Sequence, residues 1–290
     1  MASNRYTAVH APGVTRGPGD ARPTSLQIIK DEGLEDKLED KIMLITGCSS
    51  GLGIETARAL SATGARLILT ARNLEKGRQA LGNILDGTDR IQLVKLDLES
   101  LASVRECAEV VKKITGGKLN TLICNAGVRH TPEGKTKDGF ETQWGVNHVA
   151  HFLLFQLLKT SLLAASSPSF ASRVIMSVHP GGIRTGLQHV ECQDAWLIFK
   201  VAFFQFRLPT VMRSMKSVEQ GAATTVWAAV SKDLEGRGGR YLENCSESAP
   251  VKNGYHVDEP GYVATAFNED AEKRCWKMTC DLVEIENSDF

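Results

Sequence analysis

An excess of charge of either sign is missing from this sequence of 290 residues, in which 34 lysines and arginines balance 34 aspartates and glutamates. A neutral chain gives no electrostatic reason to expect a nucleic acid or an anionic membrane as partner. Long apolar runs are missing as well. The longest, residues 195–206, has 12 residues and includes Lys200 and Gln205, whereas a transmembrane helix needs about 20. We therefore expect no transmembrane segment, and a buried or interfacial helix at residues 195–206.

The sequence also has no Cys-x-x-Cys pair, and we expect neither a secretory leader nor a metal site. The seven cysteines include no Cys-x-x-Cys motif, and an odd number of scattered cysteines is typical of a reducing compartment. The N-terminus lacks the apolar stretch of a signal peptide, so we expect a cytoplasmic protein. His148 and His151 lie three positions apart, which is too few ligands for a metal site. We interpret them as surface or packing residues.

The spacing of apolar residues predicts one large α/β domain. Residues 1–25 carry several glycines and prolines and are predicted to be a flexible leader, which leaves residues 26–290 for the domain. Alternation of apolar strands with helices favours a Rossmann-like, doubly wound parallel sheet that is covered on both faces. The predicted strands are 41–46, 66–71, 91–96, 121–124 and 173–178, and the predicted helices are 54–63, 74–85, 101–114 and 140–163.

A glycine-rich loop follows the first predicted strand, with the pattern Thr46-Gly47-x-x-x-Gly51-x-Gly53. Glycine suits such a loop because the backbone must turn tightly and approach a pyrophosphate, whose charge the next helix N-terminus stabilises. Any tight strand-to-helix turn can use glycines, but the position after the first strand favours a dinucleotide site. The predicted cofactor-binding residues here are Thr46, Gly47, Ser49, Ser50, Gly51, Leu52 and Gly53.

Arg72 is the candidate for choosing between cofactors. It follows the second predicted strand, and no Asp or Glu occupies residues 70–74. An acidic residue there would hydrogen-bond a ribose hydroxyl, whereas an arginine suits a 2′-phosphate. The alternative is an ordinary solvated loop arginine. We predict NADP(H) as the cofactor, with NAD(H) less favoured.

Polar segments also follow the third and fourth strands: Asp97-Leu98 and Asn125-Ala126-Gly127. Ligands of open parallel sheets bind at the carboxyl ends of the strands, so these segments are predicted to lie beside the cofactor. Taken singly, each fits an ordinary Asp turn or Asn-Gly-type loop. Taken together with the glycine loop, in this order and spacing, they resemble the short-chain dehydrogenase/reductase family. The resemblance is closest to its retinol-dehydrogenase-like branch and fungal relatives, which share Arg-Asn after the second strand.

The resemblance covers roughly residues 40–290 and implies roles for individual residues. It gives Asp97 a contact with adenine, and residues 125–127 the task of stabilising the sheet beside the cofactor. Asn147 matches the family's active-site asparagine, on its fourth helix. Residues 179–185 resemble the Pro-Gly-x-x-x-Thr loop that lies along the nicotinamide and its phosphates. This adds Pro180, Gly181 and Thr185 to the cofactor set.

The family's catalytic Tyr-x-x-x-Lys, in contrast, has no counterpart. The residues four positions after Tyr6, Tyr241, Tyr255 and Tyr262 are His10, Cys245, Glu259 and Ala266. The strand at 173–178, whose Ser177 is the candidate for the family's catalytic serine, leads directly into the Pro-Gly loop. Neighbouring parallel strands need a crossover of a dozen or more residues, so one strand and one crossover helix are predicted to be absent. Residues 195–206 would then cover the exposed sheet face, or the protein would form a homo-oligomer or be poorly stable. The alternative is an intact enzyme whose gene model lacks this segment.

Three functions fit these residues. The first is an NADP(H)-dependent oxidoreductase that acts on a small-molecule alcohol or carbonyl, with Asn147 and Ser177 as its remaining catalytic residues and with impaired acid-base chemistry. The second is an inactive NADP(H)-binding or regulatory protein. The third is a non-redox enzyme, an isomerase or a cyclase, that uses the same pocket. The resemblance favours the first as the lineage and leaves the substrate unidentified.

Overall fold

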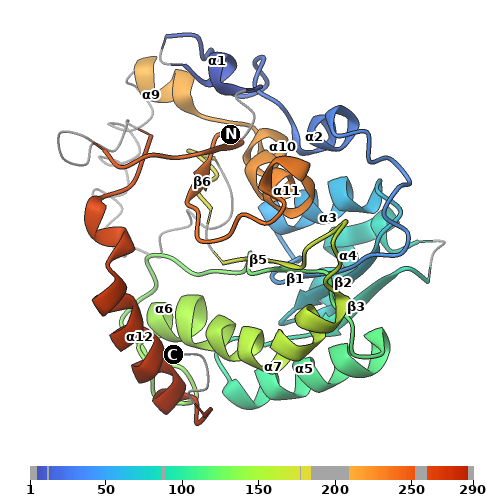
Figure 1. Ribbon diagram of the computed structural model, residues 1–290, viewed down its shortest axis with the longest axis vertical. Helices are drawn as coiled ribbons and strands as arrows, with labels where there is room; N and C mark the ends of the chain where they lie inside the picture. Colours follow the sequence, from blue (N-terminus) through green and yellow to red (C-terminus); the bar gives the residue numbers. More distant parts are fainter. Residues whose placement is uncertain are drawn as a thin grey trace.

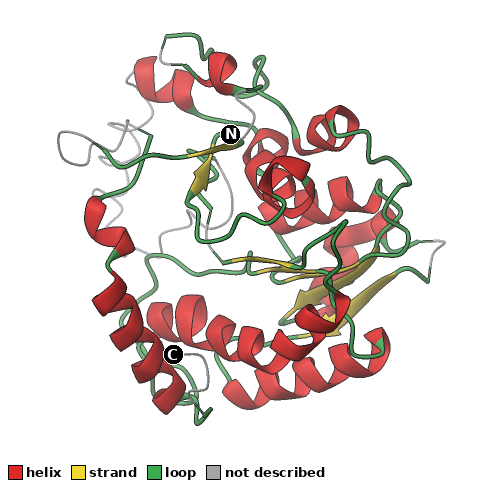
Figure 2. Ribbon diagram, in the orientation of Figure 1, coloured by secondary structure: helices red, strands yellow, loops and turns green. Residues whose placement is uncertain are grey.

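A computed structural model describes residues 5–11, 13–86, 89–176, 178–183, 209–251 and 260–286 of the chain. Ser177, Thr185 and the apolar run at 195–206 therefore lie outside the described residues. A five-stranded parallel sheet with helices on both sides forms the centre of the domain (Figures 1 and 2), which confirms the Rossmann-like prediction. Its strands are β1 (Ile42–Ile45), β2 (Arg66–Ala71), β3 (Ile91–Lys95), β4 (Thr121–Ile123) and β5 (Arg173–Ile175).

All five strands are parallel, in the spatial order β3-β2-β1-β4-β5, and the order in which the chain adds strands changes sides at β1. From β1 the chain proceeds to β2 on one side, and later returns to place β4 on the other side. At such a switch point the loops after the two central strands separate and leave a crevice at the carboxyl edge of the sheet. The glycine loop follows β1, so the topology places it at this crevice.

Alternate side chains along the strands pack into two separate hydrophobic cores, one on each face of the sheet. Met43 and Ile45 belong to one buried cluster, whereas Leu44 between them belongs to the other, because successive strand side chains point to opposite faces. All three are fully buried. A sheet with helices on both faces requires such uninterrupted apolar strands, and the sequence supplies them.

Among the described helices on one face of the sheet, α2, α3, α10 and α11 lie together above it in Figure 1. Helix α11 packs against α2, and α2 and α10 both pack against α3, with the fully buried Trp227 of α11 as the largest side chain of this core. The bounds are α2 (Ser25–Asp31), α3 (Leu52–Ser61), α10 (Val218–Gly221) and α11 (Ala223–Val230).

The opposite face is covered by α5 (Leu101–Thr115) and α7 (Ala150–Ala165), which pack against each other. The predicted helix 140–163 is divided into α6 (Thr142–Trp144), a π-helical turn (Gly145–Val149) and α7. By length and composition Thr142–Ala165 could cross a membrane, but half of its apolar window is buried inside the domain. The core position explains its apolar sequence. Helix α12 (Glu269–Leu282) lies along α6 (Figure 1), and α4 (Leu74–Leu81) packs beside β2 and β3.

The N-terminal segment does not fit a flexible leader. Arg22 is buried, and its guanidinium donates to Asp20 Oδ1 at 2.8 Å and to the Ser214 carbonyl at 2.8 Å. The side chain of Gln220 in α10 accepts from the Gly19 amide and donates to the Arg22 carbonyl, each at 3.0 Å. The prediction was based on the glycines and prolines of this segment. It was wrong because polar side chains, among them Arg22 and Gln220, bind the segment to the domain. Its described part belongs to the domain rather than preceding it.

After β5 the described chain continues directly toward the Pro-Gly loop, without a crossover helix between them. Strand β5 ends at Ile175, and only three residues separate it from His179, which forms a parallel bridge with Glu243 of the short strand β6 (Leu242–Glu243). A parallel crossover of a dozen residues has no room there. Strand β6 instead forms a small hairpin with β7 (Ser246–Glu247). In the described part of the chain, β5 is therefore an edge of the five-stranded sheet.

Candidate functional site

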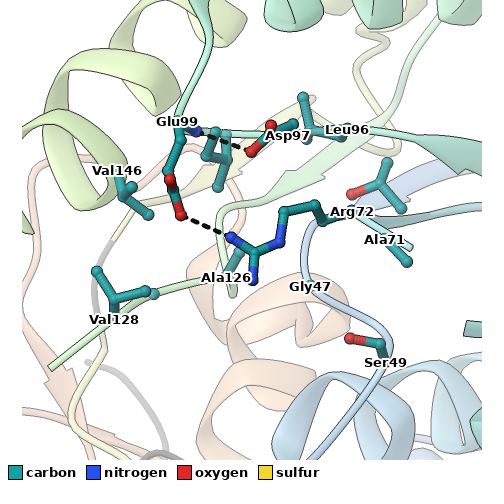
Figure 3. A pocket seen from close by; sticks show the side chains of 13 residues that line it. Gly47, Ser49, Ala71, Arg72, Leu96, Asp97, Glu99, Ala126, Val128 and Val146 are labelled. Atoms are coloured by element: carbon teal, nitrogen blue, oxygen red, sulfur yellow. Dashed lines mark hydrogen bonds and ion pairs between the residues drawn. The ribbon is translucent and has the colours of Figure 1, made fainter. Parts of the chain in front are cut away.

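A cavity of about 140 Å³ lies at the carboxyl ends of the strands (Figure 3). It unites predicted residues from four loops: Gly47 and Ser49, Arg72, Asp97 and Leu98, and Ala126 and Gly127. Six other predicted residues lie close in sequence to residues that line the cavity: Thr46, Ser50, Gly51, Leu52, Gly53 and Asn125. Pro180 and Gly181 do not line the cavity. Sequence reasoning missed Thr70, Ala71, Leu96, Glu99, Val128 and Val146, which also line it.

The glycine loop leaves no space for side chains at two of its positions. Gly47 has a φ of +75°, and a Cβ there would lie 2.8 Å from Cα of Ala126. A Cβ on Gly53 would lie 2.6 Å from Nδ2 of Asn125. Only glycine allows both this turn and this close approach of α3 to β4.

Helix α3 begins at this loop with its amide groups available. Its N-cap residue is Gly51, with a φ of +60°, and within the described structure no side chain caps the helix. The first amides of a helix have no intrahelical partners and carry part of the helix dipole. The N-terminus of α3 can therefore bind an anion at the edge of the cavity.

Asn125 and Ala126 hold the glycine loop to the end of β4. The Asn125 side-chain amide donates to the carbonyl of Thr46 at 2.8 Å and to that of Gly47 at 3.3 Å. The backbone amide of Ala126 donates to Oγ1 of Thr46 at 2.9 Å. These bonds join segments about 80 residues apart in the chain, so residues 125–126 fix the shape of the loop rather than its access to a ligand.

Asn147 lies in the π-helical turn that precedes α7. Its Oδ1 accepts from the Val128 amide and its Nδ2 donates to the Val128 carbonyl, both at 2.8 Å. This paired contact connects the helix to the loop after β4. Single π-turns within helices are frequent at functional sites, and the side chain of Asn147 remains exposed beside the cavity.

His151 is a further residue of this region that sequence reasoning placed only as packing. It is buried, with Nε2 3.0 Å from Thr46 Oγ1 and Nδ1 3.3 Å from the Asn147 carbonyl. Burial is the main reason that its pKa is lowered to about 4; the Asn147 carbonyl opposes the shift and the nearby His148 adds to it, so the ring is neutral at pH 7. A proton on Nδ1 satisfies both contacts, since the carbonyl can only accept. His151 thus joins the glycine loop to the π-helical turn, and its signal was the four-residue spacing from Asn147.

His148 has a separate environment and confirms the packing interpretation. Its ring stacks on Trp144 at 4.2 Å between centroids, and Nε2 lies 3.0 Å from Thr279 Oγ1 of α12. In the part of the chain that the structure describes, no group of three or more His, Cys, Asp or Glu is arranged to hold a metal ion.

Three charged residues, Arg72, Asp97 and Glu99, line the cavity, and Lys137 lies beside it. Arg72 Nη1 lies 2.6 Å from Glu99 Oε1, and Lys137 Nζ lies 2.7 Å from Asp97 Oδ2. Burial opposes ionisation of Asp97, but the hydrogen bonds from Lys137 and the Glu99 amide outweigh it and lower its pKa. The absence of an acid within residues 70–74 suggested an unopposed Arg72. That expectation was wrong, because the loop after β3 brings Glu99 to it.

Lys216 lies under the Pro180-Gly181 loop. It is 4% exposed, and its Nζ donates to Oδ1 of Asn244 at 2.9 Å. A Cβ on Gly181, which has a φ of +92°, would lie 2.9 Å from Cε of Lys216. Burial is the main reason that the pKa of Lys216 is lowered to about 8, while Cys245, Glu243 and Asp20 oppose the shift. No sequence motif around Lys216 predicted this buried position beside Gly181.

The lowered pKa predicts how stability depends on pH. An unfolded lysine titrates near 10.5 and folded Lys216 near 8, so the folded state binds fewer protons between these values and its stability rises with pH there. Lys216→Met should remove this rise, which amounts to roughly 3 kcal/mol. Urea unfolding of both proteins between pH 8 and pH 10.5 measures it.

Lys113→Met is the matched control, because Lys113 is exposed on α5. It should leave the pH dependence of the parent protein unchanged. Parallel stability curves for the parent protein and Lys216→Met would contradict the assignment.

Comparison with known proteins agrees with this fold and loop set. The sequence model of the short chain dehydrogenase family matches residues 41–178. The short-chain dehydrogenase/reductase prx1 of Penicillium roqueforti is 38% identical over 93% of this chain and 92% of its own. The oxidoreductase calI of Penicillium decumbens is 31% identical over 99% of both. The crystal structure of an uncharacterised protein from Mycobacterium paratuberculosis superposes with a TM-score of 0.54, at 26% identity, over 85% of this chain and 94% of that one.

The fold and the loops at its carboxyl edge define a Rossmann-like α/β protein. The chain belongs to the short-chain dehydrogenase/reductase family. The alignment with the Penicillium roqueforti relative is longer than the part of this chain that it includes. It takes in 93% of the 290 residues, about 270, but extends over 325 aligned positions. About 55 positions of the alignment therefore have no residue in this chain.

Proposed function

We propose that this chain binds NADP(H) at the carboxyl edge of its sheet and descends from oxidoreductases that interconvert alcohols and carbonyl compounds. We also propose that hydride transfer by the chain in its present sequence is very slow or undetectable. One combination carries the proposal: a complete glycine loop before an uncapped helix, in a sequence without any Tyr-x-x-x-Lys.

The residues present fit a dinucleotide. The amides at the start of α3 suit the pyrophosphate, and the turns at Gly47 and Gly51, both at positive φ, shape the loop that leads into this helix. The adenosine end suits the cavity between Arg72 and Asp97. On the cavity wall the buried hydroxyl of Thr70 has no hydrogen-bond partner within the described structure, which is a further polar group for a ligand. Asn147, and Pro180 and Gly181 by resemblance, belong to the nicotinamide end.

The chemistry that remains is incomplete. A bound NADP(H) supplies or accepts a hydride. The substrate oxygen must also gain or lose a proton, for which the family uses the tyrosine that is absent here. The amide of Asn147 and the hydroxyl of Ser177 do not exchange protons readily near neutral pH, and His151 is buried behind Thr46. Loss of a general acid-base group typically costs about 10²–10⁴-fold in rate.

The structure and the relatives support a missing segment as the cause. Only seven residues lie between Ile175 and Ile183, where the family places a helix and a strand before its Pro-Gly loop. The roughly 55 alignment positions that have no residue in this chain would together suffice for both elements. A homo-oligomer that covers the exposed sheet edge stays a prediction.

Titration with NADPH and NADH, followed by calorimetry or by cofactor fluorescence, tests the binding function. We expect tighter binding of NADPH, because Arg72 can pair with a 2′-phosphate. Arg72→Gln should weaken NADPH by about tenfold, since a charge-assisted hydrogen bond contributes about 1.5–3 kcal/mol, and should leave NADH within about twofold.

Arg78→Gln, the same change at an exposed site on α4, is the control and should alter neither affinity. Equal affinities for the two cofactors, or tighter NADH, would contradict the choice of NADP(H). Binding of neither cofactor would contradict the proposed function itself.

A further inference from the structure

Glu99 is not one of the site residues predicted from the sequence. It nevertheless contacts Arg72, the residue that is predicted to distinguish NADP(H) from NAD(H). Arg72 follows β2 and Glu99 follows β3, and these two strands are paired in parallel up to Ala71 and Lys95. The two loops therefore leave the sheet side by side. Figure 3 shows the Glu99 carboxylate and the Arg72 guanidinium pointing toward each other across the cavity.

The backbone of Glu99 is held by two hydrogen bonds, whereas its side chain is partly exposed. Its amide donates to Asp97 Oδ1 at 3.2 Å, and its carbonyl accepts from the Lys137 amide at 2.9 Å. The Glu99 side chain, in contrast, is 36% exposed and the Arg72 side chain 69%. A ligand can displace the carboxylate by rotating one side chain, with no rearrangement of the loop.

The charges of the two ion pairs that involve the cavity wall cancel. Arg72 and Lys137 are positive, and Glu99 and Asp97 are negative, in two ion pairs of 2.6 and 2.7 Å. Asp97 is already committed to Lys137 and to the Glu99 amide. Glu99 is thus the acid that competes directly with a phosphate for Arg72, and its charge repels a phosphate placed there.

We propose that Glu99 is a specificity-determining residue, which holds Arg72 in an ion pair and thereby lowers the affinity of the site for the 2′-phosphate of NADP(H). The inference rests on the proposed cofactor-binding function. An ion pair between exposed groups is weak, so a dianionic phosphate can break it at moderate cost. Glu99 then sets how strongly the site prefers NADP(H) over NAD(H).

Glu99→Gln tests this by direct binding. The variant keeps the shape of the side chain and removes its charge. We expect the Kd for NADPH to fall by about three- to tenfold and the Kd for NADH to change by less than about twofold. Titration with 2′,5′-ADP against ADP should show the same ratio, which assigns the effect to the 2′-phosphate. The control is Glu106→Gln, an equal change of charge at an exposed position of α5.

The outcomes separate the inference from the function on which it rests. If the parent protein binds NADPH and Glu99→Gln leaves its affinity unchanged, the inference is wrong and the proposed function stands. Weaker NADH binding in Glu99→Gln, with NADPH unchanged, would instead give Glu99 a contact with the ribose hydroxyl and also overturn the inference. If the parent protein binds neither dinucleotide, both fail.

Discussion

Insertion of a Tyr-x-x-x-Lys crossover from a relative between Ser177 and Val178 should raise the rate of carbonyl reduction by about 10²–10⁴-fold. The physical reason is the proton. Hydride addition leaves negative charge on the substrate oxygen, and in the chain as it stands no tyrosine is followed four positions later by a lysine. The oxidation of NADPH in the presence of a panel of ketones and aldehydes measures the rate.

A matched insertion that carries Phe and Met in place of Tyr and Lys separates chemistry from structure. It should restore the strand and the helix without restoring the rate. If the parent protein itself turns over at ordinary enzyme rates, about 1–10³ s⁻¹, another residue supplies the acid and the proposed impairment is wrong.

Gly53→Val should reduce dinucleotide affinity by at least about a hundredfold. Gly53 lies in the first turn of α3, where even a Cβ would lie 2.6 Å from Nδ2 of Asn125 and still closer to the Gly47 carbonyl oxygen. Both atoms belong to the network that shapes the glycine loop, so a branched side chain must push the loop or the helix away. Titration with NADPH measures the loss.

Gly238→Val is the control, because no described atom lies within 4 Å of a Cβ built there. Its NADPH affinity should equal that of the parent protein. Gly53→Ala, with a smaller side chain, should fall between the two, and a thermal melt of each variant shows whether it folds. A folded Gly53→Val that binds NADPH as tightly as the parent would place the cofactor elsewhere.

The sequence predicted the layered sheet and most of the cofactor loop correctly, because these features depend on neighbours in the chain. Apolar runs such as the one at β2 become buried strands whatever surrounds them, provided that helices cover both faces. Glycines at 47 and 51, with φ values of +75° and +60°, are needed for a local backbone shape. The roles of Ser177 and Thr185 stay predictions, since both lie outside the described residues, as does the cytoplasmic location.

Two departures from these expectations share one cause. The N-terminal segment was expected to be flexible from its glycines and prolines, but Gln220, about 200 positions later, binds Gly19 and Arg22. The helix predicted at 140–163 is present over Thr142–Ala165, and only its hydrogen bonding departs from the expectation, in a π-helical turn at Gly145–Val149, where Asn147 pairs with Val128. In both places a side chain makes a contact that the local pattern does not predict.

The sequence by itself thus determined the family, the parallel sheet, the glycine loop and the absence of the catalytic Tyr-x-x-x-Lys. Only the tertiary structure showed that Glu99 pairs with Arg72, that His151 joins Thr46 to Asn147, and that Lys216 lies under Gly181. Each of these side chains meets its partner through the packing of separate strands, helices or loops. Backbone shape is set by residues next to one another, whereas the charge and hydrogen-bonding of a site depend on which distant residues the fold brings together.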